Sequence, residues 1–266
     1  MEKKTILSIQ KKKDEREPIV ALTCYDAYTG RLIDQAGVDV ALVGDSLANT
    51  RLGYPNTIPV TLEEMIHHVR ASSRGVKQAL LVADMPFQTY EAAPWKAAVA
   101  AGRFLKEGRA QAVKLEGGER VADSIKAILK ANVPVMGHLG LTPQSIYQEG
   151  GYRVHGRKPQ EARRLFNEAK LLQKLGVFAL VLEGVPGNLA RRISRALRIP
   201  TIGIGAGVGC DGQVLVLDDL LGFSESPSPK FVKKFANLRP LMEKAIRAYR
   251  SDVLRRRFPG PQNTYQ

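Results

Sequence analysis

The chain has no long hydrophobic run and very few cysteines. No stretch of its 266 residues approaches the roughly 20 consecutive apolar residues that cross a bilayer. Residues 1–17 are charged throughout and lack the apolar core of a signal peptide. We therefore expect a cytoplasmic protein with no membrane partner. The two cysteines cannot form a disulfide framework and show no metal-ligand spacing, so Cys24 and Cys210 are expected to be structural.

The sequence also lacks the usual companions of a nucleic-acid-binding surface, although its formal net charge is +14 at pH 7. No basic strand interleaved with aromatics, zinc spacing or recognition helix is present. The excess of lysine and arginine lies in peripheral segments, residues 11–13, 191–198 and 247–257. We expect a solvated basic surface and no nucleic-acid partner. The alternative is a nucleic-acid-binding protein. In that case nucleic acid would copurify with the protein and would dissociate at high salt.

What the sequence does contain is a set of eight short apolar runs. They are rich in Val, Ile and Leu and are continuous rather than alternating, as expected for strands that are buried on both faces. A chain of 266 residues also matches the roughly 250 that are typical of an eight-stranded β/α barrel. The runs cover residues 19–23, 38–43, 79–83, 112–115, 133–136, 179–182, 199–204 and 214–217.

Helical stretches lie between the runs. Thr61 and Glu64 form a capping-box pattern before a helix over residues 65–73, because the hydroxyl and the carboxylate can each satisfy an orphan amide. Further helices are expected over residues 92–107, 120–131, 159–175 and 188–197. The alternation predicts a parallel sheet. We expect one (β/α)8 TIM barrel over residues 1–266, with an N-terminal helical extension (about 1–17) and a basic C-terminal tail (about 251–266).

Most of the runs end at a residue that can do chemistry. Because β/α barrels keep their active sites at the carboxyl ends of the strands, the repetition predicts a cluster of charged groups at one rim. The residues concerned are Asp26, Asp45, Asp84, Glu116, His138, Glu183, Asp218 and Asp219.

Three of these carboxylates follow consecutive strands and predict a magnesium site. Asp45 and Asp84 would offer hard oxygen ligands from neighbouring positions, and Mg²⁺ commonly takes one or two protein carboxylates together with substrate oxygens and water. Glu116 could complete the shell directly or through a water. Lys114 alternates with Glu116 along its strand, so it faces the same side and can hold a substrate carboxylate. Any one carboxylate alone could equally be a helix N-cap or a surface ion pair.

Two segments that contain several glycines are candidates for ligand-binding loops. Residues 140–158 form the longest irregular segment and follow the run that ends at His138, so they are expected to act as a lid or binding loop. The cluster Gly203, Gly205 and Gly207 is followed by another strand pattern and not by a helix. This order argues against a dinucleotide-binding fingerprint.

Several strings then identify a resemblance. Over about residues 5–250, in order and without a large gap, the chain resembles the ketopantoate hydroxymethyltransferase family, also called 3-methyl-2-oxobutanoate hydroxymethyltransferases. The strings are VGDSL, ADMPF, VKLEGGE, GHLGLTPQS, GGYRVHGR, LEGVP and GIGAG followed by DGQ. The resemblance implies a barrel of the phosphoenolpyruvate/pyruvate type that makes ketopantoate from 3-methyl-2-oxobutanoate and 5,10-methylenetetrahydrofolate, the first committed step toward pantothenate and coenzyme A.

The resemblance also implies roles for individual residues. Asp45, Asp84 and Glu116 would hold one Mg²⁺ per subunit, and Asp45 and Asp84 would share with Ser46 and Lys114 the binding of the 2-oxo acid. Glu183 would accept the proton. The family assembles as large homo-oligomers, commonly decamers.

Physical chemistry agrees with these roles. A 2-oxo acid can chelate Mg²⁺ through a carboxylate oxygen and the ketone oxygen, and the charge that develops when C3 loses its proton is then stabilised. A carboxylate such as Glu183, with its pKa raised by an apolar surround, is a suitable base. His138 could orient substrate or water, or could be a structural hydrogen-bonding group.

Some features depart from the family pattern or leave alternatives open. Ala48 and Asn49 stand where a glycine and an apolar residue are common, and residues 255–266 are more basic than expected and lack a His. His67 and His68 are expected to face the sheet or a neighbouring subunit. Another Mg²⁺-dependent 2-oxo acid lyase or mutase of the same superfamily would share the carboxylates, but it would need a nucleophilic or acidic group, often Cys, on a loop after the fourth or fifth strand. The oligomer number, the physiological ion and the folate-docking residues stay open.

Overall fold

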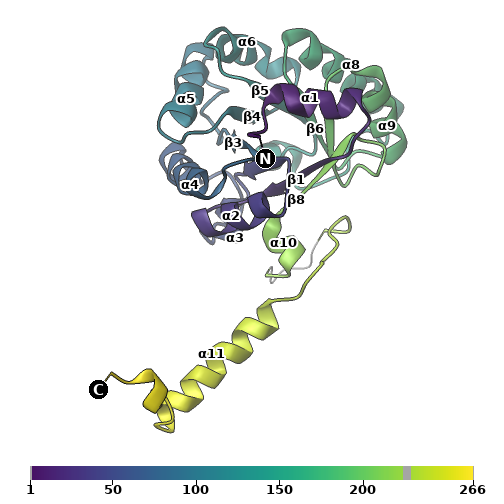
Figure 1. The fold of residues 1–266 in the computed structure, drawn as a ribbon. Helices are drawn as coiled ribbons and strands as arrows, with labels where there is room; N and C mark the ends of the chain where they lie inside the picture. Colours follow the sequence, from purple (N-terminus) through teal and green to yellow (C-terminus); the bar gives the residue numbers. More distant parts are fainter. Residues whose placement is uncertain (1, 224–228, 266) are drawn as a thin grey trace. The chain divides into compact units, whose positions relative to one another are not determined.

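The computed structural model describes residues 2–223 and 229–265. Its centre is a closed barrel of eight parallel strands in sequence order, each paired with its neighbour and β8 paired with β1 (Figure 1). This arrangement confirms the predicted (β/α)8 barrel. The strands are β1 (Ile19–Thr23), β2 (Val40–Val43), β3 (Leu80–Asp84), β4 (Ala112–Glu116), β5 (Val135–Gly140), β6 (Ala179–Glu183), β7 (Thr201–Ile204) and β8 (Gly212–Leu215).

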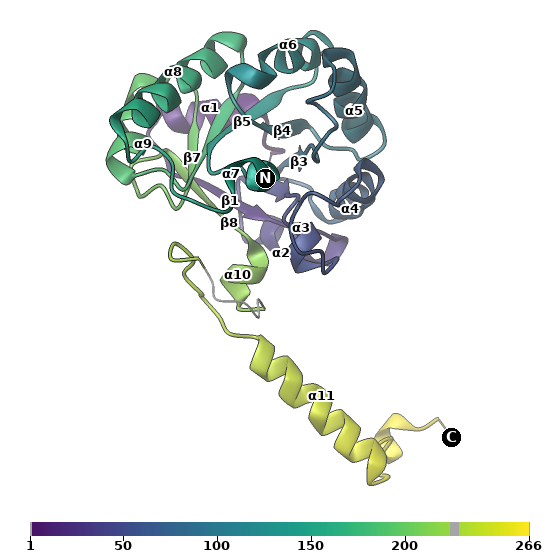
Figure 2. The ribbon, with the colours of Figure 1, turned by 180° about the vertical axis from the view of Figure 1, so that it is seen from behind.

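Helices lie outside the strands, as both views of the ribbon show (Figures 1 and 2). The described helices of this part are α1 (Ile6–Asp14), α2 (Ala27–Gln35), α3 (Leu47–Thr50), α4 (Leu62–Gly75), α5 (Pro94–Lys106), η1 (Glu119–Val121), α6 (Ala122–Lys130), η2 (Pro143–Ser145), α7 (Ile146–Glu149), α8 (Pro159–Leu175) and α9 (Gly187–Ala196). None of the described helices is both long and apolar enough to cross a membrane.

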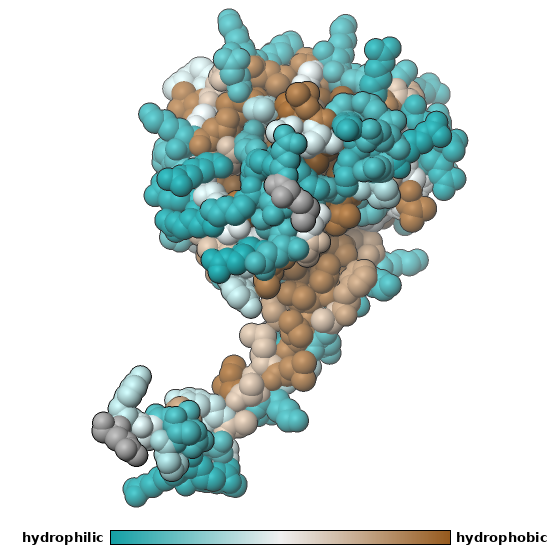
Figure 3. Space-filling model, in the orientation of Figure 1, coloured by the Kyte–Doolittle hydropathy of each residue, from teal (hydrophilic) through white to brown (hydrophobic). Residues whose placement is uncertain are grey.

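The chain divides into two compact units, residues 1–216 and 217–266. The second contains α10 (Leu217–Leu221), α11 (Arg239–Leu254) and η3 (Pro261–Asn263). Along α11, the apolar side chains of Met242, Ile246, Tyr249 and Val253 follow one another at helical spacing and are exposed. Figure 3 shows hydrophobic surface along this unit, whereas hydrophilic residues cover much of the barrel unit.

Local chemistry explains where the elements begin. The capping box of α4 is present, because Glu64 N–H donates to Thr61 Oγ1 and Thr61 N–H donates to Glu64 Oε2, at 3.2 and 2.8 Å. Strands β5 and β7 each start two residues later than the apolar runs suggested. Pro134 and Pro200 have no amide hydrogen to donate to a ladder, so β5 and β7 begin after them.

Part of the basic excess is used inside the fold. Lys12 Nζ lies 2.8 Å from Asp39 Oδ2 and Lys13 Nζ lies 2.7 Å from Asp211 Oδ2. Asp39 and Asp211 directly precede β2 and β8, so these pairs hold α1 against the amino ends of the strands. These lysines therefore neutralise the protein's own carboxylates and are not part of the solvated basic surface that was expected for residues 11–13.

Strands β2 to β5 are buried along their whole length, which is why their sequences read as continuous apolar runs. The register sets polar residues of neighbouring strands side by side. Asp84 pairs with Lys114, and Glu116 pairs with His138. At the next step Gly140 pairs with Glu183. The carboxyl ends of β3 to β6 thus carry one continuous row of chemically active groups.

Candidate active site

The core of the site is an ion pair between the ends of β3 and β4. Asp84 Oδ1 lies 2.7 Å from Lys114 Nζ, and both side chains are buried. Asp45, two residues beyond β2, joins them through its backbone N–H, which donates to Asp84 Oδ2 at 3.1 Å. Gly44 makes this approach possible, because a Cβ there would lie 2.8 Å from Ser46 Oγ and 3.4 Å from Asp84 Oδ2.

The acidic groups outnumber the cationic ones in this buried place. Desolvation raises the pKa of Asp84 to about 7, against the opposing charge of Lys114. Desolvation, followed by the charge of Asp45, raises the pKa of Glu116 well above its ordinary value. Desolvation lowers the pKa of Lys114, but the charges of Asp84, Asp45 and Glu116 outweigh it, so the net shift is upward. Lys114 therefore stays positively charged, and its single charge does not balance the three carboxylates around it.

A divalent cation fits this donor set. The three carboxylates Asp45, Asp84 and Glu116 offer oxygen atoms only, as Mg²⁺ prefers. Asp84 Oδ1 is buried and accepts no hydrogen bond of good geometry, although it contacts Lys114. Within the described part of the chain, no three His, Cys, Asp or Glu side chains form a ready-made metal shell. One or two carboxylates as direct ligands would agree with that arrangement.

Gln144 connects the carboxylates, and sequence reasoning did not single it out. Its carboxamide Nε2 donates to Asp45 Oδ2 at 2.9 Å and to Met85 O at 3.0 Å, and its backbone N–H donates to Glu116 Oε2 at 3.1 Å. Its Oε1 accepts the hydroxyl of Tyr90 at 2.6 Å. Gln144 lies within the GHLGLTPQS string, so the family motif covered the residue while its role came only from the contacts.

Ser46 lies beside the carboxylates at the start of α3. Its Oγ is 2.8 Å from the hydroxyl of Tyr25. His68 Nδ1 is 2.7 Å from Tyr25 O, so His68 faces the turn after β1, while His67 is exposed. Because the helix turns His67 outward, that side chain does not face the sheet, and a neighbouring subunit stays its expected partner.

His138 lies between Glu116, one of the candidate metal ligands, and Glu183. Its Nδ1 is 3.4 Å from Lys114 Nζ and 3.6 Å from Glu116 Oε1, and its Nε2 is 3.2 Å from Glu183 Oε2. Desolvation, followed by the charge of Lys114, lowers the pKa of His138 well below its ordinary value, so the ring is neutral. With Nδ1 facing an ammonium group, the proton of the neutral ring belongs on Nε2, toward Glu183.

Glu183 is more accessible than the other acids of the site. Its side chain is 16% exposed, compared with 2% for Glu116 and 4% for Asp84. Desolvation raises the pKa of Glu183 to about 7, with Lys114 opposing. Gly140 allows this placement, since it has φ +101° and a Cβ there would lie 2.1 Å from Glu183 O. The arrangement gives a reachable carboxylate that exchanges a proton near neutral pH.

Three of the other strand-end residues lie at the starts of helices. Asp26 is the N-cap of α2, where its side chain accepts the N–H of Thr29 at 2.7 Å. Asp218 and Asp219 lie in the first turn of α10, in the second unit. The prediction that all the strand-end acids gather at one rim is therefore too broad, because an acid after a strand can also cap the helix that follows.

Residues 140–158 are not irregular throughout, since they contain η2 and α7. Asn56 Nδ2 donates to Tyr147 Oη at 3.0 Å, and His155 Nε2 lies 2.7 Å from Glu149 Oε2. The segment has no Cys. Cys24 is buried after β1 and burial raises its pKa to about 12, while burial also raises the pKa of Cys210, between β7 and β8. Neither cysteine supplies the loop nucleophile expected of a lyase or mutase.

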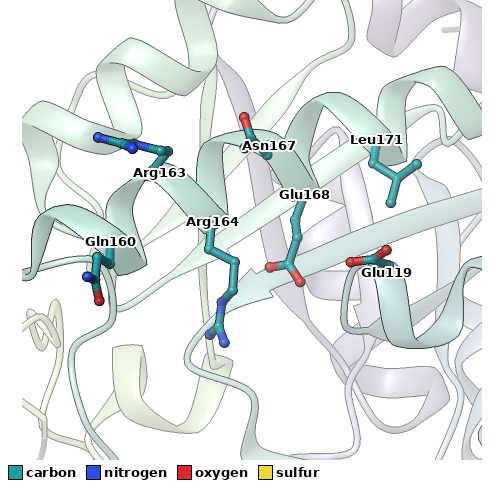
Figure 4. A pocket seen from close by; sticks show the side chains of 7 residues that line it. All are labelled: Glu119, Gln160, Arg163, Arg164, Asn167, Glu168 and Leu171. Carbon is teal, nitrogen blue, oxygen red and sulfur yellow. The ribbon is translucent and has the colours of Figure 1, made fainter.

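The glycine cluster is followed by β8 and not by a helix, which confirms that it is not a dinucleotide fingerprint. An open depression of about 510 Å³ lies on the outer side of α8 and η1, and none of the predicted site residues lines it. In Figure 4 the side chains of Arg163 and Arg164 point apart, so they do not converge on a common ligand. Its lining residues are Glu119, Gln160, Arg163, Arg164, Asn167, Glu168 and Leu171.

The barrel is similar to those of several solved structures. Solved structures of similar fold include phosphonopyruvate hydrolase in complex with oxalate and Mg²⁺ (TM-score 0.63, 10% identity, 98% of this chain and 93% of that one) and 2,3-dimethylmalate lyase (TM-score 0.58, 15% identity, 96% and 88%). At such identities they show the fold alone.

Sequence relatives are much closer. The chain is 52% identical over 263 residues to 3-methyl-2-oxobutanoate hydroxymethyltransferase of Syntrophotalea carbinolica, covering 99% of this chain and 98% of that protein. It is 53% identical to the enzyme of that name from Geotalea uraniireducens, with 98% of each covered. Residues 3–261 match the family model described as ketopantoate hydroxymethyltransferase. The chain therefore belongs to the ketopantoate hydroxymethyltransferase family.

Proposed function

We propose that this protein transfers a hydroxymethyl group from 5,10-methylenetetrahydrofolate to 3-methyl-2-oxobutanoate and so forms ketopantoate for pantothenate and coenzyme A biosynthesis. About half of its residues are identical, over nearly the full length, to enzymes named for this reaction. The observation that carries the proposal is the pairing of a buried Asp45, Asp84 and Lys114 cluster with an accessible carboxylate, Glu183, whose pKa is raised to about 7.

Asp45 and Asp84 would hold Mg²⁺, with Glu116 as a third ligand or as an acceptor for a metal-bound water. Three buried carboxylates near one ammonium group leave negative charge that a divalent cation would balance. When bound, Mg²⁺ would supply Lewis-acid polarisation of the ketone oxygen and make the C3 proton more acidic.

Lys114 and Ser46 would bind the 2-oxo acid. The Lys114 ammonium already contacts Asp84 and stays charged in the buried site, so it can receive the substrate carboxylate without first gaining a proton. Ser46 Oγ, held by the Tyr25 hydroxyl at 2.8 Å, can donate or accept a further hydrogen bond at the same rim. These contacts would fix the C3–H bond toward Glu183.

Glu183 would take the C3 proton. With a pKa of about 7 it is partly ionised at neutral pH and basic enough to act as a general base. Neutral His138 would lie beside that carboxylate, with Nε2 3.2 Å from Glu183 Oε2 and without a hydrogen bond of good geometry to it. Water would supply the hydroxyl oxygen: its addition to the methylene bridge breaks both C–N bonds, each folate nitrogen keeping the electron pair and gaining one of the two protons of the water, and leaves the one-carbon unit at the formaldehyde level. The electron pair left at C3 then forms the new C–C bond to that carbon, and its carbonyl oxygen takes a proton to become the hydroxyl group.

Proton exchange tests the first half of this reaction. In D₂O with 3-methyl-2-oxobutanoate and Mg²⁺ but without folate, the protein should replace the C3 proton by deuterium, which ¹H NMR follows as loss of the C3 signal. Wild-type protein that bound the 2-oxo acid but left its C3 proton in place would contradict the proposal.

We also propose a homo-oligomer, with a decamer as the expected form, and a cytoplasmic location. The exposed apolar residues along α11 support self-association, since large apolar patches rarely stay uncovered. Light scattering coupled to size exclusion would give the number of subunits, and a monomer across the micromolar range would contradict this part of the proposal.

A further inference from the structure

We propose that Gln144 is a positioning residue that restricts Asp45 and Glu116 to one free oxygen each and thereby makes the cation site discriminate against Ca²⁺. This inference rests on the proposed metal site. It is carried by a hydrogen-bond network in which buried Gln144 contacts both carboxylates: its side-chain Nε2 donates to Asp45, and its backbone N–H donates to Glu116.

The contacts determine which way the carboxamide points. Gln144 Nε2 lies 2.9 Å from Asp45 Oδ2 and 3.0 Å from Met85 O, and neither of these atoms can donate a hydrogen bond when Asp45 is ionised. A flipped amide would set its oxygen against both acceptors. Its Oε1 instead receives the Tyr90 hydroxyl at 2.6 Å. Only one orientation satisfies all three neighbours.

Tyr90 closes the network on the Glu116 side. The N–H of Glu116 donates to Tyr90 Oη at 3.3 Å, and the hydroxyl hydrogen of Tyr90 is directed to Gln144 Oε1. The backbone N–H of Gln144 then donates to Glu116 Oε2 at 3.1 Å. Every donor points one way around this ring. Because the network is buried, each missing partner would leave a polar group unsatisfied.

The consequence concerns the oxygens that remain. Asp45 Oδ2 and Glu116 Oε2 are taken by Gln144, so Asp45 Oδ1 and Glu116 Oε1 are the atoms left to face a cation. Ca²⁺ takes six to eight oxygens and often binds carboxylates through both oxygens, whereas Mg²⁺ accepts single carboxylate oxygens in a strict octahedron. By withholding the second oxygen of two carboxylates, Gln144 favours the smaller ion.

Metal binding measures this effect without catalysis. Mn²⁺, a paramagnetic ion with a similar preference for octahedral oxygen sites, can be titrated into the full-length protein by EPR and then displaced by Ca²⁺. Gln144→Met keeps the length of the side chain but removes its hydrogen bonds to Asp45, Met85 and Tyr90. The backbone N–H of residue 144 can still donate to Glu116, so the variant tests the second oxygen of Asp45. We expect this variant to raise the affinity for Ca²⁺ relative to Mn²⁺ by about tenfold or more, the scale of one hydrogen bond to a charged group.

A second variant and a matched control make the test specific. Tyr90→Phe removes the hydroxyl that orients the carboxamide and that accepts the N–H of Glu116, while the Gln144 side chain is kept, so its selectivity should shift in the same direction by less. The double variant should match Gln144→Met alone, because Tyr90 acts through Gln144. Ser145→Ala alters the neighbouring residue, whose Oγ accepts from Arg120, and should leave the selectivity unchanged.

The outcomes separate the inference from the function on which it rests. If the wild-type protein binds Mn²⁺ and both Gln144→Met and Tyr90→Phe keep its Mn²⁺ to Ca²⁺ preference within about twofold, the positioning role of Gln144 is wrong while the metal site stands. If the wild type binds no Mn²⁺, the proposed metal site and this inference both fail. Should Gln144→Met not fold by circular dichroism, the Tyr90→Phe result decides.

Discussion

Replacing Glu183 by Gln separates proton removal from substrate binding. The substitution keeps the shape of the side chain but removes its ability to take a proton. Glu183 is the most exposed acid of the site and contacts His138 Nε2 at 3.2 Å, whereas Asp45 and Asp84 lie in the neighbouring carboxylate cluster. We therefore expect Glu183→Gln to bind the 2-oxo acid and Mg²⁺ almost as well as the wild type.

The size of the catalytic loss follows from the role of the carboxylate. Removing a general base slows proton transfer by roughly 10²–10⁴-fold, so exchange at C3 in D₂O should fall by that factor. The wild type should also show the titration of this group. With a pKa of about 7, kcat/KM should fall roughly tenfold per pH unit below neutrality and level off above it, because the ionised form is the base.

Calorimetry of 2-oxo acid binding in Glu183→Gln, measured beside the exchange rate, gives the decisive pair of numbers. Loss of binding together with exchange would place Glu183 among the binding groups. Exchange at the wild-type rate in this variant would refute its role as the base. Glu168→Gln is a suitable control, since that acid lies on α8 outside the carboxylate cluster and its pKa is also raised by desolvation.

Further outcomes test the remaining parts of the site. Asp84→Ala should abolish C3 exchange while circular dichroism stays native; exchange at the wild-type rate would exclude Asp84 as a ligand. Lys114→Met should raise KM with some loss of kcat, by about 2–5 kcal/mol in total; an unchanged KM would make Lys114 a structural partner of Asp84. Hydrogen exchange over residues 140–158 should slow when Mg²⁺ and 3-methyl-2-oxobutanoate are added, and equal protection would show a static segment. Because the folded-state pKa of Glu183 is raised to about 7, this carboxyl stabilises the metal-free fold more when protonated, so the Tm of the wild type should fall relative to that of Glu183→Gln as pH rises from 4 to 7; parallel Tm profiles of the two proteins would contradict the assignment.

The barrel could be predicted from the sequence because burial on both faces makes each strand a continuous apolar run. Strand limits were harder to place. β5 continues beyond its apolar run through Gly137, His138 and Gly140, which are not apolar. Gly140 lets the end of β5 approach the backbone of β6 closely, since a Cβ there would meet Glu183 O. β8 begins at Gly212, earlier than the run that starts at residue 214, because its pairing with β1 starts there.

Some helices escape prediction because the same residue fits two patterns. Asp26 fits both a strand-end acid and a helix N-cap, and the structure shows it as the N-cap of α2. Gly30, within α2, weakens the helical pattern but permits close packing on α4, where a Cβ would meet Ser72 O at 3.0 Å. For α11, Pro240 in the first turn and the apolar spacing of Met242, Ile246 and Tyr249 would have indicated the helix.

The parts of the site that escaped prediction are contacts between distant segments. Lys114 and Glu116 share a strand, so their common face follows from the period of two. Gln144 and Asp45 are 99 positions apart, and Gln144 and Tyr90 are 54 apart. Nothing in the local pattern of a Thr-Pro-Gln-Ser turn specifies that a glutamine will lie between two carboxylates. Such contacts depend on where the closed barrel brings its loops.

Transfer of a labelled carbon tests the central claim most directly. The wild-type protein would be supplied with Mg²⁺, 3-methyl-2-oxobutanoate and 5,10-methylenetetrahydrofolate carrying ¹³C in its methylene group, and the products followed by ¹³C NMR. The account predicts that the label appears in a new hydroxymethyl group on C3, that the C3 proton is lost, and that Glu183→Gln fails to do this. A label that stays on the folate while wild-type protein binds both substrates, or a 2-oxo acid that is cleaved instead of extended, would contradict it.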